Sequence, residues 1–176
     1  MSEQYILKES EVRLKLAKGR GLYSEVPLTS PETAIKTMSV LLKELDHEIA
    51  CVVNLDNKLH PINYTIVGMG SSNTCPIPIA SVLRSALLSG ASSIMLLHNH
   101  PSGDVTPSRE DIEVTHKLIL ASHLTETPLM DHIIVGGYTG EYYSIRSEHP
   151  EIDFSKTPDC VKKPEQPSVR HKRIGR

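Results

Sequence analysis

The residues best suited to chemistry lie in one stretch, HNHPSGDVTPSRED, in which His98 and His100 follow an apolar run directly. Side chains two positions apart in an extended segment point to the same side, so both imidazoles can reach one ion. Neutral imidazole is a favoured zinc ligand. The loop after it adds carboxylates at Asp104, Glu110 and Asp111.

Two histidines and one carboxylate, with a fourth position left open, are typical of a catalytic zinc site rather than a structural one. Each part also has a plainer interpretation. A histidine pair in a loop is often polar surface, and Ser108 with Asp111 fits a helix capping box. The two interpretations of this pair are compatible, because a helix N-terminus can present both side chains on one face. The combination favours a metal site.

The hydropathy pattern predicts the elements that position these residues. Apolar residues recur at three- and four-residue steps in the expected helices and form short runs in the expected strands. Their order indicates an α/β fold, a mixed β-sheet flanked by helices in a single layered domain. We expect helices at about 30–45, 79–89 and 108–122, and strands at about 48–55, 63–69, 92–97, 132–135 and 142–145.

The periodic part of the chain predicts a domain over residues 30–147. Residues 1–29 lack sustained periodicity and are expected to be an extended lead-in with one short strand. Residues 148–176 are polar and proline-bearing, and we expect a disordered C-terminal tail there. No internal repeat and no glycine-rich phosphate loop occurs, so no nucleotide cofactor is implied.

Charge is distributed unevenly along a chain whose formal net charge is −2. The acidic body offers no electrostatic footprint for nucleic acid. The tail could bind an acidic partner or nucleic acid weakly, or could simply be solvated. Its basic residues are Lys162, Lys163, Arg170, Lys172, Arg173 and Arg176.

The three cysteines form no C-x-x-C pair, which argues against a zinc ribbon and a disulfide scaffold. Cys51 is expected to be a buried core thiol, and Cys75 lies in a loop that we expect near the site. No signal peptide and no apolar run of membrane-spanning length is visible. These features predict a cytoplasmic protein with reduced thiols and no membrane partner.

The spacing H-x-H-x7-S-x-x-D resembles the JAMM motif of the MPN-type (JAB) metalloproteases. The fuller text HNHPSGDVTPSREDI, together with the segment MDHIIVG, resembles the RadC-like branch of that superfamily. The similarity covers about residues 30–147. It implies a cytidine-deaminase-like layered fold and a zinc-dependent metallopeptidase or amide hydrolase acting on a peptide or protein substrate.

The resemblance also implies a role for each residue that matches the motif. His98, His100 and Asp111 match the three zinc (Zn²⁺) ligands. Ser108 matches the serine that helps to hold the developing oxyanion, and Glu48 matches the upstream glutamate that activates the attacking water. From composition alone, Glu48 would be an ordinary carboxylate at a helix–strand junction.

Other functions remain open at this point. MPN domains that lack the ligands serve as non-catalytic scaffolds. A metal-dependent nuclease is less favoured, because the letters HNH here are adjacent, whereas the nuclease motif of that name spreads over tens of residues. Longer RadC-like proteins carry a helix-hairpin-helix-like region that residues 1–29 do not resemble, so a DNA-repair-linked context is implied only weakly.

Asp131 and His132 could support the site or form a structural hydrogen bond. The oligomeric state is not readable.

Overall fold

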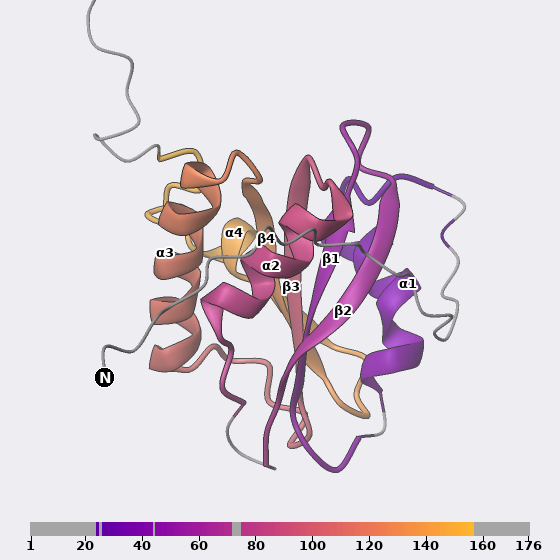
Figure 1. The fold of residues 1–176 in the computed structure, drawn as a ribbon. Coiled ribbons are helices and arrows are strands. Elements are labelled where there is room, and N and C mark those ends of the chain that lie inside the picture. Colours follow the sequence, from indigo (N-terminus) through magenta and orange to yellow (C-terminus); the bar gives the residue numbers. More distant parts are fainter. Residues whose placement is uncertain (1–23, 25, 44, 72–74, 157–176) are drawn as a thin grey trace, which may run out of the picture.

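The computed structural model describes residues 24, 26–43, 45–71 and 75–156. A five-stranded sheet forms the centre of the domain, in the order β2-β1-β3-β4-β5 (Figure 1). Among the strands of the described residues, β3 and β4 pair in parallel, and the other neighbours are antiparallel. The predicted α/β class, with a mixed sheet flanked by helices, is therefore confirmed. The elements are α1 (Pro31–Leu42), β1 (Ile49–Leu55), β2 (Pro61–Met69), α2 (Ile79–Ser89), β3 (Ser93–His100), α3 (Arg109–Leu124), β4 (Leu129–Gly136), β5 (Tyr142–Ser144) and α4 (Ile145–Glu148).

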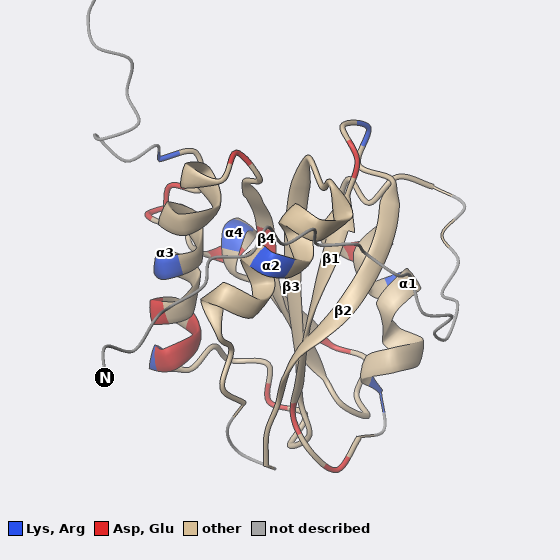
Figure 2. Cartoon of the chain, viewed as in Figure 1, with Lys and Arg blue, Asp and Glu red and all other residues tan. Residues whose placement is uncertain are grey.

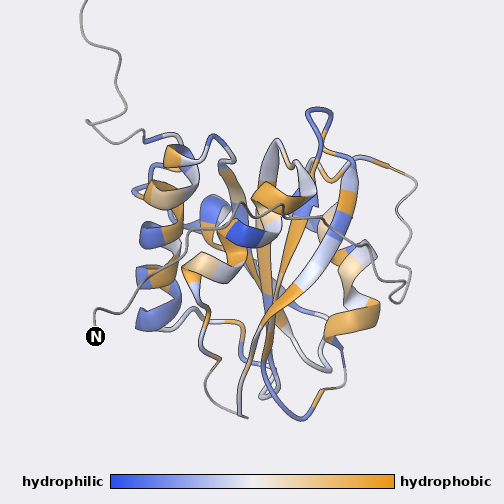
Figure 3. Cartoon of the chain, viewed as in Figure 1, coloured by the Kyte–Doolittle hydropathy of each residue, from blue (hydrophilic) through white to orange (hydrophobic). Residues whose placement is uncertain are grey.

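The central strands β1 and β3 are buried along nearly their whole length, because helices cover both faces of the sheet (Figure 1). Helix α1 packs on one face, where Met38 and Leu42 share a buried apolar cluster with Cys51 and Leu97. Helices α2, α3 and α4 pack on the other face. Figure 3 shows apolar residues gathered on the central strands and polar residues along much of α3. The predicted burial of Cys51 is confirmed.

Local signals in the sequence set several element boundaries. Ser30 caps α1 in a capping box with Thr33, and Pro31 occupies the first helical turn. Gly90 ends α2 in a left-handed conformation with φ 61°, which glycine adopts without steric penalty. Helix α1 ends at Leu42, earlier than the apolar pattern predicts, because the Lys43 backbone is extended.

Strand β3 runs through His100, three residues beyond the predicted end. It continues because His98 and His100 still pair in parallel with β4, opposite Ile134 and Gly136. The two histidines therefore lie among the last residues of a regular strand and not in a loop. This placement makes their side-chain directions predictable from strand geometry.

Packing continues past the predicted boundary at residue 147. Ile152 and Phe154 are buried in the cluster under α3, and His123 contacts the Phe154 carbonyl oxygen at 3.0 Å through Nε2. A correct boundary requires these two apolar residues to be recognised within a polar stretch. The predicted disordered tail beyond residue 156, and most of the predicted lead-in with its short strand, fall outside the described residues.

Across the described ranges, no helix is long and apolar enough to cross a membrane. The cytoplasmic location stays a prediction.

Candidate metal centre

His98, His100 and Asp111 come together at the carboxyl end of β3, where α3 begins. One ligand atom from each lies within 4.8 Å of the other two. The two histidine Nε2 atoms are 3.0 Å apart, and His98 Nε2 lies 3.3 Å from Asp111 Oδ1. Two ligands bound at about 2.0–2.1 Å to a tetrahedral zinc are about 3.3–3.4 Å apart. The observed spacing therefore suits one small cation.

Hydrogen bonds assign the tautomer of His98. Thr115 Oγ1 donates to the Asp111 carbonyl oxygen at 2.7 Å, so its own oxygen accepts from His132 Nδ1, also at 2.7 Å. Burial lowers the pKa of His132 well below its ordinary value, so this ring is neutral and its Nε2 accepts. His98 Nδ1 then donates to His132 Nε2 at 2.9 Å. The lone pair of His98 Nε2 is left facing the cavity.

His100 is oriented in the same sense by a different partner. Its Nδ1 lies 2.7 Å from the Asp104 carbonyl oxygen, which can only accept, so Nδ1 carries a proton. Burial also lowers the pKa of His98 to about 4, which keeps that ring neutral near pH 7. Two imidazole nitrogens and a carboxylate thus converge as electron-pair donors. A cation bound between these three groups would relieve their mutual repulsion, and the types of ligand atom fit zinc.

Asp111 belongs to the group of three converging side chains and also caps α3. Its Oδ2 accepts from the Ser108 backbone N–H at 2.7 Å and from the Ser108 hydroxyl at 2.5 Å. The Ser108 Oγ accepts from the Asp111 backbone N–H at 3.1 Å. The capping interpretation of this pair is confirmed, and it is compatible with the predicted metal role, since the cap occupies Oδ2 and Oδ1 lies nearest to His98.

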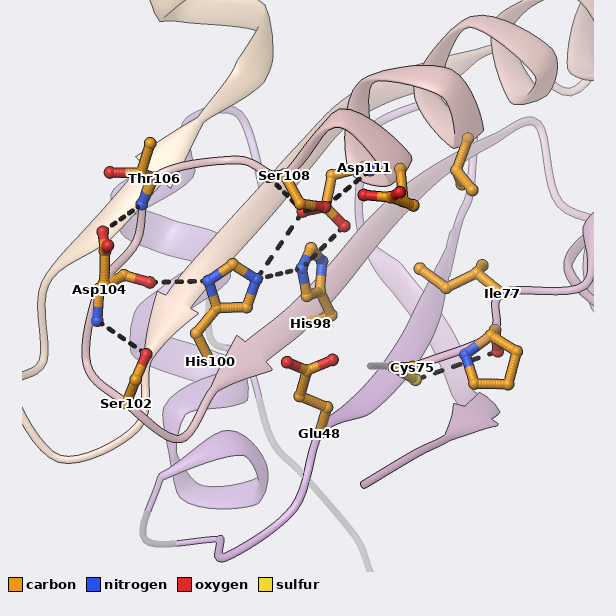
Figure 4. A pocket seen from close by; sticks show the side chains of 13 residues that line it. Glu48, Cys75, Ile77, His98, His100, Ser102, Asp104, Thr106, Ser108 and Asp111 are labelled. Carbon is orange, nitrogen blue, oxygen red and sulfur yellow. Dashed lines mark hydrogen bonds and ion pairs between the residues drawn. The ribbon is translucent and has the colours of Figure 1, made fainter. Parts of the chain in front are cut away.

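Glu48 immediately precedes β1 and lies across from the histidines in the same cavity (Figure 4). Extending the β1–β3 register, in which Ala50 pairs with His98, places Glu48 opposite His100. Its carboxylate makes no hydrogen bond or ion pair to another described residue. The pKa of Glu48 is raised, mainly by burial and also by the negative charge of Asp111, while His100 opposes the shift. The group is therefore better placed to accept a proton than an exposed glutamate.

The cavity has a volume of about 710 Å³. Its lining combines apolar residues, Pro76, Ile77 and Val114, with acidic ones, among them Asp104 and Glu110. Figure 2 shows the acidic first turn of α3 at this end of the domain. Among the described residues, no lysine or arginine lines the cavity.

Cys75 also lines this cavity, as its position in the sequence predicts, but it is outside the group of three converging ligands. Burial raises the pKa of its thiol to about 11, with a further contribution from the charge of Glu48. A protonated thiol is a poor metal ligand. Cys75 therefore forms part of the wall.

Asp131 and His132 are adjacent but have separate roles. The Asp131 carboxylate accepts from the backbone N–H of His132, the backbone N–H of Arg146 and the hydroxyl of Ser144, which ties β4 to α4. His132 points to the site and contacts His98. The structural interpretation thus holds for Asp131. His132 contacts a candidate ligand, and its supporting role at the site stays a prediction. The Thr115 and Asp104 contacts gave no signal in the sequence, because they depend on tertiary packing.

Comparison with known proteins identifies the family of this chain. The family model described as RadC-like JAB domain matches residues 28–150. The chain belongs to this family.

Relatives of this RadC-like chain include UPF0758 proteins of Chloroflexus aurantiacus, 34% identical over 146 residues, and Methanosarcina mazei, 35% identical over 137 residues. These alignments cover 80% and 76% of this chain, and 63% and 59% of the relatives. A UPF0758 protein of Caldanaerobacter subterraneus subsp. tengcongensis is 41% identical over 113 residues, 64% of this chain and 48% of the relative. The chain thus spans less than two thirds of the length of these relatives.

Proposed function

We propose that this protein is a zinc-dependent amide hydrolase that cleaves a peptide or isopeptide bond in a peptide or protein substrate. The observation that carries the proposal is the convergence of His98 Nε2, His100 Nε2 and an Asp111 oxygen, with both histidine Nδ1 atoms already bonded elsewhere. When both rings are neutral, the atoms that face one another are lone-pair donors to a cation. A divalent cation is the partner that this arrangement fits best.

His98, His100 and Asp111 would hold the zinc. Zinc at such a site polarises the substrate carbonyl and lowers the pKa of water to about 7. His132 and Asp104 keep the two imidazoles oriented, and the cap on Oδ2 keeps the Asp111 carboxylate in place.

Glu48 is the general base in this proposal. Its free carboxylate and raised pKa suit removal of a proton from the attacking water and its delivery to the leaving amine nitrogen. A positioned acid–base group contributes roughly 10²–10⁴-fold to the rate. Glu48 is only 8% exposed, so its carboxylate is largely withdrawn from bulk solvent.

Ser108 is the oxyanion donor in this proposal. In the present arrangement its hydroxyl donates to Asp111, so this proton must turn toward the substrate oxygen when the tetrahedral intermediate forms. One such donor is worth about 10²–10³-fold in kcat where it has been measured.

The cavity supports an amide substrate over a nucleic acid. Phosphate backbones are held mainly by lysine and arginine, and the described cavity lining contains neither. The DNA-repair-linked context suggested by the family resemblance, and the binding of an acidic partner by the basic tail, stay predictions. The second candidate is a metal-free scaffold of the same fold, which the intact ligand set disfavours.

Metal content decides between an enzyme and a scaffold. We expect about one zinc per chain in wild type by elemental analysis, and its loss in His100→Ala. Glu48→Gln is expected to keep the zinc but to lose roughly 10²–10⁴-fold in hydrolysis of a fluorogenic peptide or isopeptide library. Wild type that is folded but binds no added zinc rules out the hydrolase. Full hydrolysis by Glu48→Gln rules out the assigned base.

A further inference from the structure

Asn99 lies between the two histidine ligands in β3 but points to the opposite face of the sheet. Its neighbours on that face, Met95 and Leu97, belong to the apolar cluster under α1. Asn99 is completely buried there. An amide in an apolar environment is costly unless its hydrogen bonds are made, so its partners indicate why it is present.

The partners of Asn99 are backbone groups on either side of Glu48. Asn99 Oδ1 accepts from the Ile49 N–H at 2.8 Å, and Asn99 Nδ2 donates to the His47 carbonyl oxygen at 3.1 Å. These bonds occur where the β1–β3 pairing has ended, one position beyond the Ala50 and His98 pair. The amide side chain therefore replaces main-chain ladder bonds at this point.

The opposite edge of the segment around Glu48 is held by backbone hydrogen bonds. Glu48 N–H donates to the Ser71 carbonyl oxygen, and the Gly70 N–H donates to the Glu48 carbonyl oxygen, both at 2.9 Å. On the β3 side, Asn99 fixes the two peptide planes that flank Glu48. Together these bonds set the direction in which the Glu48 side chain leaves the backbone.

We propose that Asn99 is a positioning residue that holds the Glu48 backbone opposite His100 and thereby aims the Glu48 carboxylate at the metal centre. The proposal rests on the proposed function for its catalytic consequence, but not for the backbone contacts. Asn99 acts without touching a metal ligand, because its side chain is on the other face of the sheet. Leucine, of similar size, would fill the space but leave the Ile49 N–H and the His47 carbonyl oxygen unpaired.

Asn54 supplies a matched control. It is also a completely buried asparagine, it lies in β1, and its Nδ2 donates to Ser85 Oγ at 2.9 Å. Its position near the far end of β1 separates it from Glu48. Asn99→Ala and Asn54→Ala therefore each remove a completely buried amide from the same sheet, and only the first should disturb the site.

Amide hydrogen exchange of the full chain tests the backbone contact directly. In Asn99→Ala we expect the Ile49 amide to exchange at least about tenfold faster than in wild type or Asn54→Ala, since it loses its acceptor. Zinc affinity should stay within about twofold of wild type, because both histidines keep their Nδ1 partners. Unchanged exchange at Ile49 refutes the proposal. Where Asn99→Ala does not fold, Asn99→Asp serves instead, because aspartate keeps the size and the acceptor but loses the donor to the His47 carbonyl oxygen. The faster exchange is then expected at the neighbouring Glu48 amide, which belongs to the same peptide plane.

Hydrolysis supplies the second arm, as a double-mutant cycle. We expect Asn99→Ala to lower kcat about tenfold or more with little change in KM, and to have less than about a twofold effect when Glu48→Gln is already present. An equal loss in both backgrounds shows that Asn99 does not act through Glu48 and overturns the proposal. If wild type binds zinc but hydrolyses no substrate, the proposed function has failed, and the exchange at Ile49 still decides whether Asn99 holds this segment.

Discussion

Replacing His132 with phenylalanine tests whether the hydrogen-bonded chain behind the metal centre sets zinc affinity. Phenylalanine keeps an aromatic ring in this fully buried position but has no ring nitrogen. The His98 Nδ1–H then loses its acceptor, which lies 2.9 Å away in wild type. His98 is no longer held in the tautomer that presents Nε2 to the cation.

Two estimates of the effect agree. A buried N–H without a partner costs about 1–3 kcal/mol. Loss of a group that orients a metal ligand typically weakens metal binding or activity by about 10–100-fold, which corresponds to about 1.4–2.8 kcal/mol. We therefore expect zinc to bind about 10–100-fold more weakly to His132→Phe.

Competition with a chromophoric chelator measures this affinity, and circular dichroism establishes that the variant is folded. His116→Phe is the control, because His116 lies on the exposed side of α3, one residue after Thr115. Its zinc affinity should equal that of wild type. A folded His132→Phe protein that binds zinc as tightly as wild type would falsify the assigned chain from Thr115 to His98.

Three further predictions concern the cap, a buried carboxylate and metal removal. Ser108→Ala should lower the free energy of unfolding, measured by urea titration, by about 0.5–2 kcal/mol and should also weaken zinc binding, measured by zinc titration. Ser30→Ala, at the other capping box, should lower stability alone, and equal zinc affinities of the two variants contradict this. Burial raises the pKa of Asp131, so the wild-type fold loses stability as pH rises from the ordinary value of 3.8 through the raised one. Asp131→Asn keeps an acceptor for the His132 N–H and cannot ionise, so its stability relative to wild type should increase across that range in urea titrations, and a pH-independent difference argues against the shift. Zinc present at 100 times its Kd should stabilise the chain by about 2.7 kcal/mol, seen as a higher Tm that a chelator reverses, and no change in Tm contradicts binding to the folded state.

Elements that depend on nearby residues were predictable from the sequence. The Ser30 cap, the periodicity of α2 and the Gly90 stop correspond to the observed helix boundaries. The H-x-H spacing likewise places two imidazoles on one side of a strand, whatever that strand pairs with. The capping box at Ser108 could be recognised for the same reason, since its partners are three residues apart.

Local patterns in the chain therefore specify the helices and strands, the two histidines on one face and the capped carboxylate beside them. The packing of the whole domain selects which distant groups meet these residues. The β1–β3 register brings Glu48 opposite His100, β4 brings His132 against His98, and the amide of Asn99 reaches across to the segment around Glu48. Periodicity and caps arise from interactions within one turn of chain, whereas register depends on how all the strands and helices share one core, which no local pattern encodes.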